Sequence, residues 1–360
     1  MAAIDPLLVH LKQNDGSDLH LVAGQPPRFR AKGAVRIMEG EGVLSDEALR
    51  AMMREVASTR AWEEYETTGD LDFAFSLEGV ARFRANYFVQ QTGAACVFRI
   101  IPEEIISADD LGLPEAIVKL ADLEQGLVLV TGPTGSGKST TLAAIIHRIN
   151  TNHAKHIVTI EDPVEFVHQN RECVISHREV GDHTDGFAGA LRAVIRQDAN
   201  IILVGEMRDY ETISLAITAA EMGSLVFGTL HTNSAAKTID RIIDAFPAEE
   251  QSQVRISLAE SLSAVVSQLL LPTADGKGRC AAHEILLRTS GLGNVIREGN
   301  TPMISSIIQG GKNTGMQAMD DCLFALVKEG RVKASDAILK ATDKPRFEPL
   351  VAQEKQSGGS

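Results

Sequence analysis

The sequence predicts an α/β protein built from two domains. Its 360 residues suffice for two hydrophobic cores, since a domain usually takes about 100–200 residues. Up to residue 101, strand-like runs predominate and a few helices interrupt them, which predicts a mixed antiparallel sheet with helices. From residue 114 onward, continuous apolar runs alternate with helical patterns, which predicts a largely parallel sheet.

The composition narrows the classes of protein. With 44% apolar and 23% charged residues, the chain has the make-up of an ordinary soluble globular protein. The net charge of −13 repels phosphate backbones and disfavours nucleic acid as a partner. Four cysteines without a C-x-x-C pair argue against a zinc ribbon or a disulfide framework and fit a reducing cytoplasm. Neither a secretion signal nor a run of about 18 apolar residues is present, so we expect a cytoplasmic chain without membrane insertion.

The first domain is predicted to span residues 1–101. Its expected elements are a helix at 7–13, strands at 18–22 and 27–33, a helix at 45–58 capped by Ser45, and strands at 71–77, 80–89 and 94–101. Residues 102–113 are rich in proline, glycine and acidic side chains, which predicts a linker.

The second domain is predicted to have an α/β core at residues 114–272. Its expected strands are 126–132, 156–162, 200–206 and 224–232, and each ends in a polar or glycine-rich cluster. Because ligands bind beyond the carboxyl ends of parallel strands, we expect these four clusters to form one site. The apolar stripe in residues 248–272 predicts a long helix, followed by a helical subdomain at 273–345 and a disordered tail at 346–360.

The first cluster predicts a nucleotide site. Residues 132–139, GPTGSGKS, match G-x-x-x-x-G-K-[ST] between a predicted strand and a predicted helix, the context that separates a phosphate-binding loop from a chance match. Such a loop wraps its backbone N–H groups around phosphates, while its lysine reaches the β- and γ-phosphates and its serine ligates Mg²⁺. We therefore predict ATP and Mg²⁺ as cofactors. The predicted binding residues are Gly132, Pro133, Thr134, Gly135, Ser136, Gly137, Lys138, Ser139 and Thr140.

Carboxylates follow the next two strands. Glu206 stands where a Walker B aspartate is usual, and it is expected to hold Mg²⁺ through water or to polarise the attacking water. Glu161, Asp162 and Glu165 lie within five residues, which suits ordering metal-bound waters and accepting a proton, although a solvated acidic turn would look the same. The general base is left open between Glu206 and these carboxylates, with Glu165 ahead of Glu161.

His231 ends the fourth strand, and two interpretations remain equal from its position alone. Its imidazole either faces the γ-phosphate of the nucleotide and reports its presence, or belongs to a core histidine bonded to a backbone carbonyl.

Three arginines of the first domain are candidates to complete the site. Period-two alternation places Arg82 and Arg84 on one face of a strand, and Arg99 lies on a neighbouring strand. An arginine supplied by a neighbouring subunit can raise the rate of phosphoryl transfer by about 10³–10⁵. From the residues alone, a plain solvated sheet face is favoured.

Five segments together resemble the secretion ATPase superfamily, most closely its pilus retraction motors of the PilT and PilU type. They are residues 80–102, 132–145, 159–169, 198–209 and 218–247, within a likeness that runs from about residue 17 to about residue 340. The resemblance implies a PAS-like N-terminal domain and a RecA-like ATPase domain. It also implies a homohexamer beneath the inner membrane, which acts with a platform protein of the type IV pilus machine and powers pilus retraction and twitching motility.

The resemblance also implies residue roles. Glu161 to Glu165 match the family's Asp box, Glu206 its atypical Walker B acid and His231 its His box. Arginines in the family's two segments that hold Arg82, Arg84 and Arg99 here reach the nucleotide from the N-terminal domain.

Two departures from the family bear on the biological role. Ser224 stands where retraction motors usually carry a second histidine, so that His231 would sense the γ-phosphate alone. Gly291, Leu292 and Gly293 interrupt a signature that the family ties to retraction. An accessory pilus motor, or an assembly or type II secretion motor, is therefore an alternative, and a DNA or conjugation motor is one from a different class. A subunit that binds ATP without turnover is disfavoured, because the lysine, serine, glutamate and histidine of the site are all present.

Overall fold

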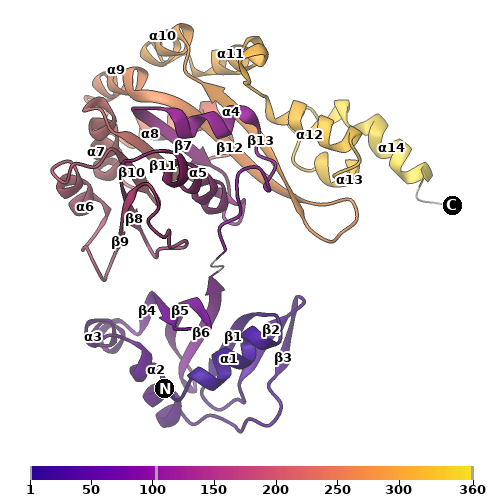
Figure 1. The fold of residues 1–360 in the computed structure, drawn as a ribbon. Helices are drawn as coiled ribbons and strands as arrows, with labels where there is room; N and C mark the ends of the chain where they lie inside the picture. Colours follow the sequence, from indigo (N-terminus) through magenta and orange to yellow (C-terminus); the bar gives the residue numbers. More distant parts are fainter. Residues whose placement is uncertain (1, 102–103, 358–360) are drawn as a thin grey trace. The chain divides into compact units, whose positions relative to one another are not determined.

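The computed structural model describes residues 2–101 and 104–357, which form two compact units. The first unit comprises Met1–Glu104 together with the short segments Asp162–Val167 and Glu179–His183, and the second comprises the rest. Each unit is built on its own sheet, so the expected α/β class is confirmed (Figure 1). Within the described residues, no helix combines the length and apolar character that a bilayer crossing requires.

The first unit contains a six-stranded sheet with the order β3-β2-β1-β6-β5-β4, in which all neighbouring strands are antiparallel. Its strands are β1 (Gly16–Val22), β2 (Arg28–Ala31), β3 (Ala34–Ile37), β4 (Asp70–Leu77), β5 (Ala81–Gln90) and β6 (Gly93–Ile101). Its helices are α1 (Asp5–Gln13), α2 (Asp46–Val56) and α3 (Thr59–Thr68). The sequence analysis missed β3 and α3 and predicted the others.

Side chains of the helices and of the sheet share one hydrophobic core in this unit. Along β5 the buried residues alternate with more exposed ones, so Phe83 and Tyr87 enter the core whereas Arg82 and Arg84 lie on the opposite face, as predicted. The predicted cap of α2 is also confirmed, because the Ser45 side chain accepts a hydrogen bond from the backbone N–H of Ala48.

The second unit contains a seven-stranded sheet with the order β13-β12-β7-β11-β10-β8-β9. Its strands are β7 (Gly126–Thr131), β8 (His156–Glu161), β9 (Val174–Glu179), β10 (Ile201–Val204), β11 (Leu225–Leu230), β12 (Leu262–Pro272) and β13 (Arg279–Leu287). The ladders from β12 through β7, β11 and β10 to β8 are parallel, and β13 is antiparallel to β12. Every residue of β7, β10 and β11 is buried, which explains their unbroken apolar sequences.

Helices connect these strands and form the C-terminal region. They are α4 (Glu115–Val118), α5 (Lys138–Asn152), α6 (Phe187–Val194), α7 (Tyr210–Glu221), α8 (Ala235–Asp244), α9 (Gln251–Ser261), α10 (Ser290–Glu298), α11 (Ile304–Gly310), α12 (Met319–Lys328), α13 (Ala334–Ala337) and α14 (Glu348–Ser357). Single 3₁₀ turns span Lys119–Asp122, Thr301–Met303, Lys312–Thr314 and Lys344–Arg346.

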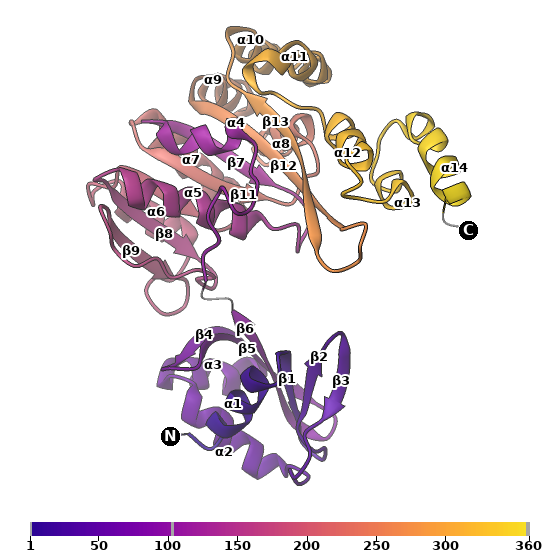
Figure 2. The ribbon, with the colours of Figure 1, turned by 45° about the vertical axis from the view of Figure 1, so that its right-hand side comes forward.

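The long helix expected over residues 248–272 is wrong. The chain is helical only to Ser261, and Leu262 then turns to extended backbone and begins β12. An apolar run of this length fits a buried strand as well as a helix, and here Val265 and Val266 pair with the central strand β7. Figure 2 shows β12 and β13 as a long hairpin that continues past the neighbouring strands. Because β13 belongs to the sheet, the expected helical region at 273–345 begins only at α10.

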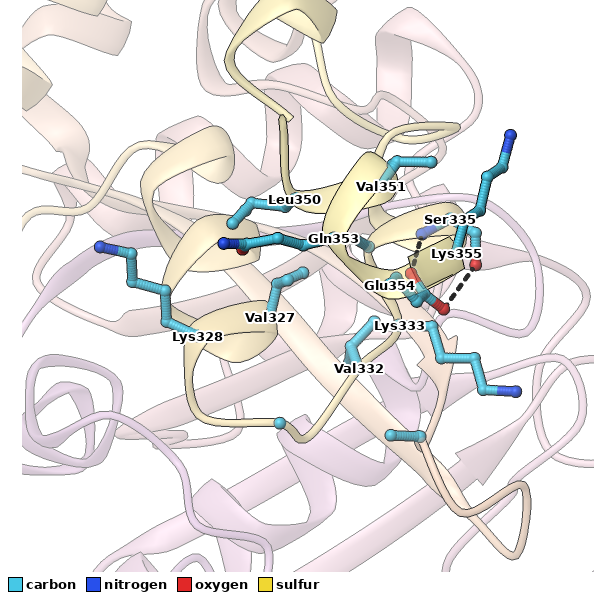
Figure 3. A pocket seen from close by; sticks show the side chains of 13 residues that line it. Val327, Lys328, Val332, Lys333, Ser335, Leu350, Val351, Gln353, Glu354 and Lys355 are labelled. Atoms are coloured by element: carbon cyan, nitrogen blue, oxygen red, sulfur yellow. Dashed lines mark hydrogen bonds between the residues drawn. The ribbon is translucent and has the colours of Figure 1, made fainter. Parts of the chain in front are cut away.

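The tail expected to be disordered from residue 346 is also helical as far as it is described. Phe347 is fully buried and its ring contacts that of Phe324 on α12, which anchors the chain just before α14. The Glu354 carboxylate accepts hydrogen bonds from the backbone N–H and the hydroxyl of Ser335, at 2.9 and 3.1 Å (Figure 3). This apolar anchor and these bonds order a segment whose polar composition predicts disorder, and residues 358–360 lie outside the described part.

Candidate active site

The glycine-rich stretch at residues 132–137 forms a loop between β7 and α5, and β12 supports it. A Cβ atom on Gly132, whose φ is +146°, would lie 2.3 Å from the carbonyl oxygen of Gln268. The Gln268 side chain donates from Nε2 to the carbonyl oxygen of Ser136 at 2.7 Å and accepts from the Thr141 hydroxyl at 2.8 Å. Gln268 thus fixes both the loop and the first turn of α5. Its role was not predicted, because the sequence pattern indicated a helix over this segment.

Two side chains of the loop are arranged to receive an anion. Lys138 Nζ donates to the carbonyl oxygens of Gly132 and Pro133, at 2.9 and 3.2 Å, so its ammonium group lies over the loop. The Ser136 hydroxyl is buried and has no hydrogen-bond partner among the described residues. A buried polar group without a partner carries a desolvation cost that a phosphate oxygen would relieve. The remaining predicted residues lie at the exposed crest (Pro133, Thr134, Gly135) and in the half-buried start of α5 (Ser139, Thr140).

Glu206 and His231 follow the adjacent parallel strands β10 and β11 and bond to each other. His231 Nε2 lies 2.9 Å from Glu206 Oε1, and Arg208 donates to Glu206 Oε2 at 2.7 Å. The hydrogen bond and charge of Arg208, together with His231, lower the pKa of Glu206, so the carboxylate is ionised near neutral pH. An ionised carboxylate only accepts hydrogen bonds, so Nε2 of His231 must carry the proton.

This geometry removes one of the two interpretations of His231. Its side chain is 46% exposed and Nε2 bonds to the carboxylate of Glu206, so it is not a core histidine bonded to a backbone carbonyl.

Glu161 lies at the same edge of the sheet. It ends β8, which pairs with β10, and the backbone N–H of Gly205 bonds to the carbonyl oxygen of Ile160 at 2.8 Å. A Cβ atom on Gly205 would lie 3.2 Å from the Cα atom of Glu161, so the ends of the two strands touch. Because β7, β11, β10 and β8 are consecutive and parallel, the phosphate loop, Glu161, Glu206 and His231 lie at the same end of the strands, as predicted.

Asp162 and Glu165 lie in the segment Asp162–Val167, which belongs to the first unit. Both side chains are exposed. Their negative charges contribute to raising the pKa of Arg84, whose principal partner is the Asp72 carboxylate. A proton-transfer role for Glu165 stays a prediction.

Each candidate arginine has a carboxylate partner within the first unit. Arg82 donates to Glu179 Oε2 at 2.6 Å and to the carbonyl oxygen of Val164 at 3.2 Å. Arg84 pairs with Asp72, and Arg99 Nε donates to Asp18 at 2.7 Å. Arg99 is the most exposed of the three, with 69% of its side chain accessible.

Ser224, which replaces the family's second histidine, does not lie beside His231 in the structure. It precedes β11, whereas His231 follows that strand, so six extended residues and roughly 20 Å separate them. The Ser224 hydroxyl bonds to the carbonyl oxygen of Ala199 at 3.2 Å. Its departure from the family pattern therefore leaves the immediate surroundings of His231 unchanged.

The sequence analysis also missed Glu284 on β13. Its carboxylate accepts a hydrogen bond from the backbone N–H of Ala235 at 2.7 Å, at the start of α8, the helix that follows His231. Burial raises the pKa of Glu284. The acidic side chain stood inside a region expected to be helical, so no sequence signal placed it at this loop.

Comparison with known proteins identifies the family. Residues 1–324 match the family described as type II/IV secretion system protein. The chain is 49% identical over 338 residues to the type IV pilus retraction ATPase PilT of Pseudomonas aeruginosa, covering 94% of this chain and 98% of that protein. It is 51% identical over 298 residues to a twitching motility protein of Neisseria gonorrhoeae, covering 83% of this chain and 80% of that protein.

A solved structure shares the whole fold. The crystal structure of the pilus retraction motor PilT with bound ADP aligns with a TM-score of 0.89 at 40% identity, covering 97% of this chain and 99% of that one. The expected fold, with an N-terminal and a RecA-like ATPase domain, is thereby confirmed. The chain belongs to the type II/IV secretion system protein family.

Proposed function

We propose that this chain is an ATP-hydrolysing motor that powers retraction of type IV pili and twitching motility. The observation that carries the proposal is the meeting of the phosphate loop, Glu161 and the Glu206–His231 pair at one edge of a parallel sheet. The names of the two relatives, a retraction ATPase and a twitching motility protein, connect such a site to pilus retraction.

The site residues divide the work of ATP hydrolysis. The N–H groups of the loop and the Ser136 hydroxyl bind phosphate oxygens, and Lys138 exchanges its two carbonyl contacts for the β- and γ-phosphates. The hydroxyl of Ser139 and the carboxylate of Glu206 are the hard oxygen ligands that Mg²⁺ prefers. Mg²⁺ held by these two groups would supply positive charge beside the phosphates.

A base must accept the proton of the attacking water. Glu206 is ionised and held by two donors, which fits orienting a water or a metal ligand. Glu165 and Glu161 are the candidates for the base, with Glu165 ahead. His231 keeps Nε2–H on Glu206, and it reports the γ-phosphate by exchanging that carboxylate for a phosphate oxygen.

The Glu206→Gln variant tests this assignment. It keeps the shape of the side chain but removes the charge, so we expect ATP binding to persist while turnover falls by roughly 10²–10³-fold. Phosphate release and nucleotide binding are the measurements, and Glu221→Gln at the exposed end of α7 is the matched control. Turnover near that of the unmodified chain would refute the role of Glu206.

We further propose that the motor is a homohexamer at the cytoplasmic face of the inner membrane, engaged with the platform protein of the pilus machine. Arg82, Arg84 and Arg99 are its candidates for contact with the nucleotide of a neighbouring subunit. Mixing Lys138→Ala subunits with Arg99→Ala subunits tests whether two subunits share one site. In a mixed ring, the intact phosphate loop of an Arg99→Ala subunit can face the intact Arg99 of a Lys138→Ala neighbour. Partial recovery of turnover is expected, and no recovery despite verified subunit exchange would exclude Arg99.

Deleting the gene separates retraction from other roles. Loss of retraction leaves excess surface pili and abolishes twitching. The departures at Gly291, Leu292 and Gly293, which lie in α10, favour an accessory motor as the second candidate. An accessory motor would leave part of the twitching intact, and an assembly motor would give cells without pili.

A further inference from the structure

Strand β9 lies at the edge of the sheet beside β8 and faces the chain that carries the proposed catalytic carboxylates. This chain, residues 160–167, is termed the carboxylate loop, and it contains Glu161 and Glu165. Successive side chains of a strand point to opposite faces, so Ile175, His177 and Glu179 share one face of β9. Ile175 enters the core, whereas the two polar side chains bond to the loop and its ends.

His177 joins the two ends of the carboxylate loop. Its Nδ1 lies 2.9 Å from the hydroxyl of Thr159, which precedes the loop in β8. Its Nε2 accepts a hydrogen bond at 3.1 Å from the backbone N–H of His168, which follows the loop. The two rings of His168 and His177 also stack, with centroids 5.9 Å apart.

The chemistry of these bonds fixes the protonation of His177. A backbone N–H can only donate, so Nε2 must be the acceptor and the proton of the neutral ring must lie on Nδ1. Nδ1–H then donates to Thr159, whose side chain is buried. The imidazole of His177 thus bridges Thr159 and His168, the residues on either side of the carboxylate loop. Both hydrogen bonds require the tautomer with the proton on Nδ1.

Glu179 holds the middle of the same loop. Its carboxylate accepts a hydrogen bond from the backbone N–H of Val164 at 3.0 Å. Val164 directly precedes Glu165 in the chain. The loop is therefore held at three points by two side chains from one face of β9.

We propose that His177, with Glu179, is a positioning residue for ATP hydrolysis, which holds the carboxylate loop in the arrangement that turnover requires. The inference rests on the proposed function, because the loop matters for turnover only if its carboxylates take part. His177 acts through the loop backbone, so its loss affects the rate of the bound complex more than the binding of ATP. A displacement of about 1 Å can lower a rate by about 10²-fold.

The test compares His177→Phe with His177→Gln. Phenylalanine keeps a ring that can stack on His168 but removes both hydrogen bonds, so kcat should fall roughly tenfold while KM for ATP changes less than about twofold. Glutamine places a carbonyl oxygen where Nε2 lies and keeps an acceptor for the His168 N–H, so it should restore most of kcat. Thr159→Val, which removes only the other bond, should give an intermediate kcat.

Amide hydrogen exchange of the full-length chain supplies a readout independent of activity. Peptides that span residues 162–168 should exchange faster in His177→Phe than in the unmodified chain, and His177→Gln should restore protection. Ser176→Ala is the matched control, because Ser176 lies on the opposite face of β9 and bonds to His156 at 3.2 Å. It should change neither kcat nor exchange in this loop.

Different variants test the positioning role of His177 and the proposed function of the loop, so failure of one can be told from failure of the other. An unchanged kcat in a folded His177→Phe variant, or a lower kcat without faster exchange in residues 162–168, overturns the positioning role. If Glu165→Gln and Glu161→Gln also keep full turnover, the proposed function of the loop fails whether or not His177 holds it in place.

Discussion

The phosphate loop follows β7 and the carboxylate loop begins at the end of β8, two strands that β11 and β10 separate in the sheet, and the two loops are held in different ways. Residues 132–137 take their shape from glycines with positive φ, and one side chain, Gln268, supports them. The carboxylate loop depends on side chains of β9, which lie 9 to 15 residues away in the sequence from the backbone N–H groups they bond. A loop encoded by its own glycines can be recognised as a motif, whereas a loop held by distant side chains cannot.

The largest expected effect belongs to the phosphate loop. Lys138→Ala removes the cation that lies over the loop, so turnover should fall by roughly 10²–10³-fold, because residues 132–139 contain no second cationic side chain. Phosphate release by the purified chain measures this. Lys119→Ala, in an exposed ion pair with Glu115, is the control, and substantial turnover by Lys138→Ala would contradict the comparison.

The next largest effect is expected from substitutions of the glycines that shape the phosphate loop. A methyl group on Gly132 would overlap the Gln268 carbonyl, whereas one on Gly135, at φ +75°, meets no atom within 4 Å. Gly132→Ala should therefore lower the free energy of unfolding by about 1–3 kcal/mol more than Gly135→Ala. Denaturant titration of both variants measures the difference, and equal losses would show that Gln268 does not constrain the loop.

The carboxylate loop should respond in rate rather than in nucleotide binding. Glu179→Gln removes the charge that accepts from Val164 and Arg82, so kcat should fall roughly tenfold while nucleotide affinity stays the same. Steady-state kinetics and nucleotide titration test this, with the exposed Glu172→Gln as the control. A matching loss of affinity would mean that the two loops are not independent.

The smallest expected effect concerns the ion pair at Glu206. Its partners lower its pKa from the usual 4.5, so the folded chain binds this proton less tightly than the unfolded chain. The resulting stabilisation is present above pH 4.5 and is lost as the pH falls through the lowered pKa.

Removing Arg208 tests the predicted direction of this pH dependence. Because Arg208 is exposed, Arg208→Ala should cost only about 0.2–1 kcal/mol of unfolding free energy at neutral pH. Denaturation at several pH values should show this difference shrinking below pH 4.5, and a difference that grows at acid pH would refute the assignment.

Local patterns predicted the parts of the fold and site that are encoded locally. The apolar runs of β7, β8, β10 and β11, the glycines of the phosphate loop and the cap of α2 all depend on neighbouring residues. The sequence missed what depends on distant partners. The run at Leu262–Pro272 became a strand because β7 pairs with it, and β9 carries no alternation of apolar and polar side chains strong enough to identify it.

The same distinction between local and distant partners explains which features of the candidate site were not predicted from the sequence. Ser224 and His231 are close in sequence, but the extended strand β11 between them places them beyond its opposite ends. Gln268 and Glu284 are far from the motifs in sequence and reach them only because β12 and β13 join the sheet. The carboxylate partners of the three arginines could not be predicted from the sequence either, because each partner lies on a different strand from its arginine.

The β12–β13 hairpin contacts both sides of the nucleotide site. Gln268 on β12 bonds to the phosphate loop, and Glu284 on β13 bonds to the start of the helix that follows His231. A continuous antiparallel ladder, from Ala264–Leu287 to Pro272–Arg279, connects the two strands. One hairpin therefore joins the loop before α5 to the start of α8, and its far half, at Leu271, Cys280 and Ala282, packs in one core with α12.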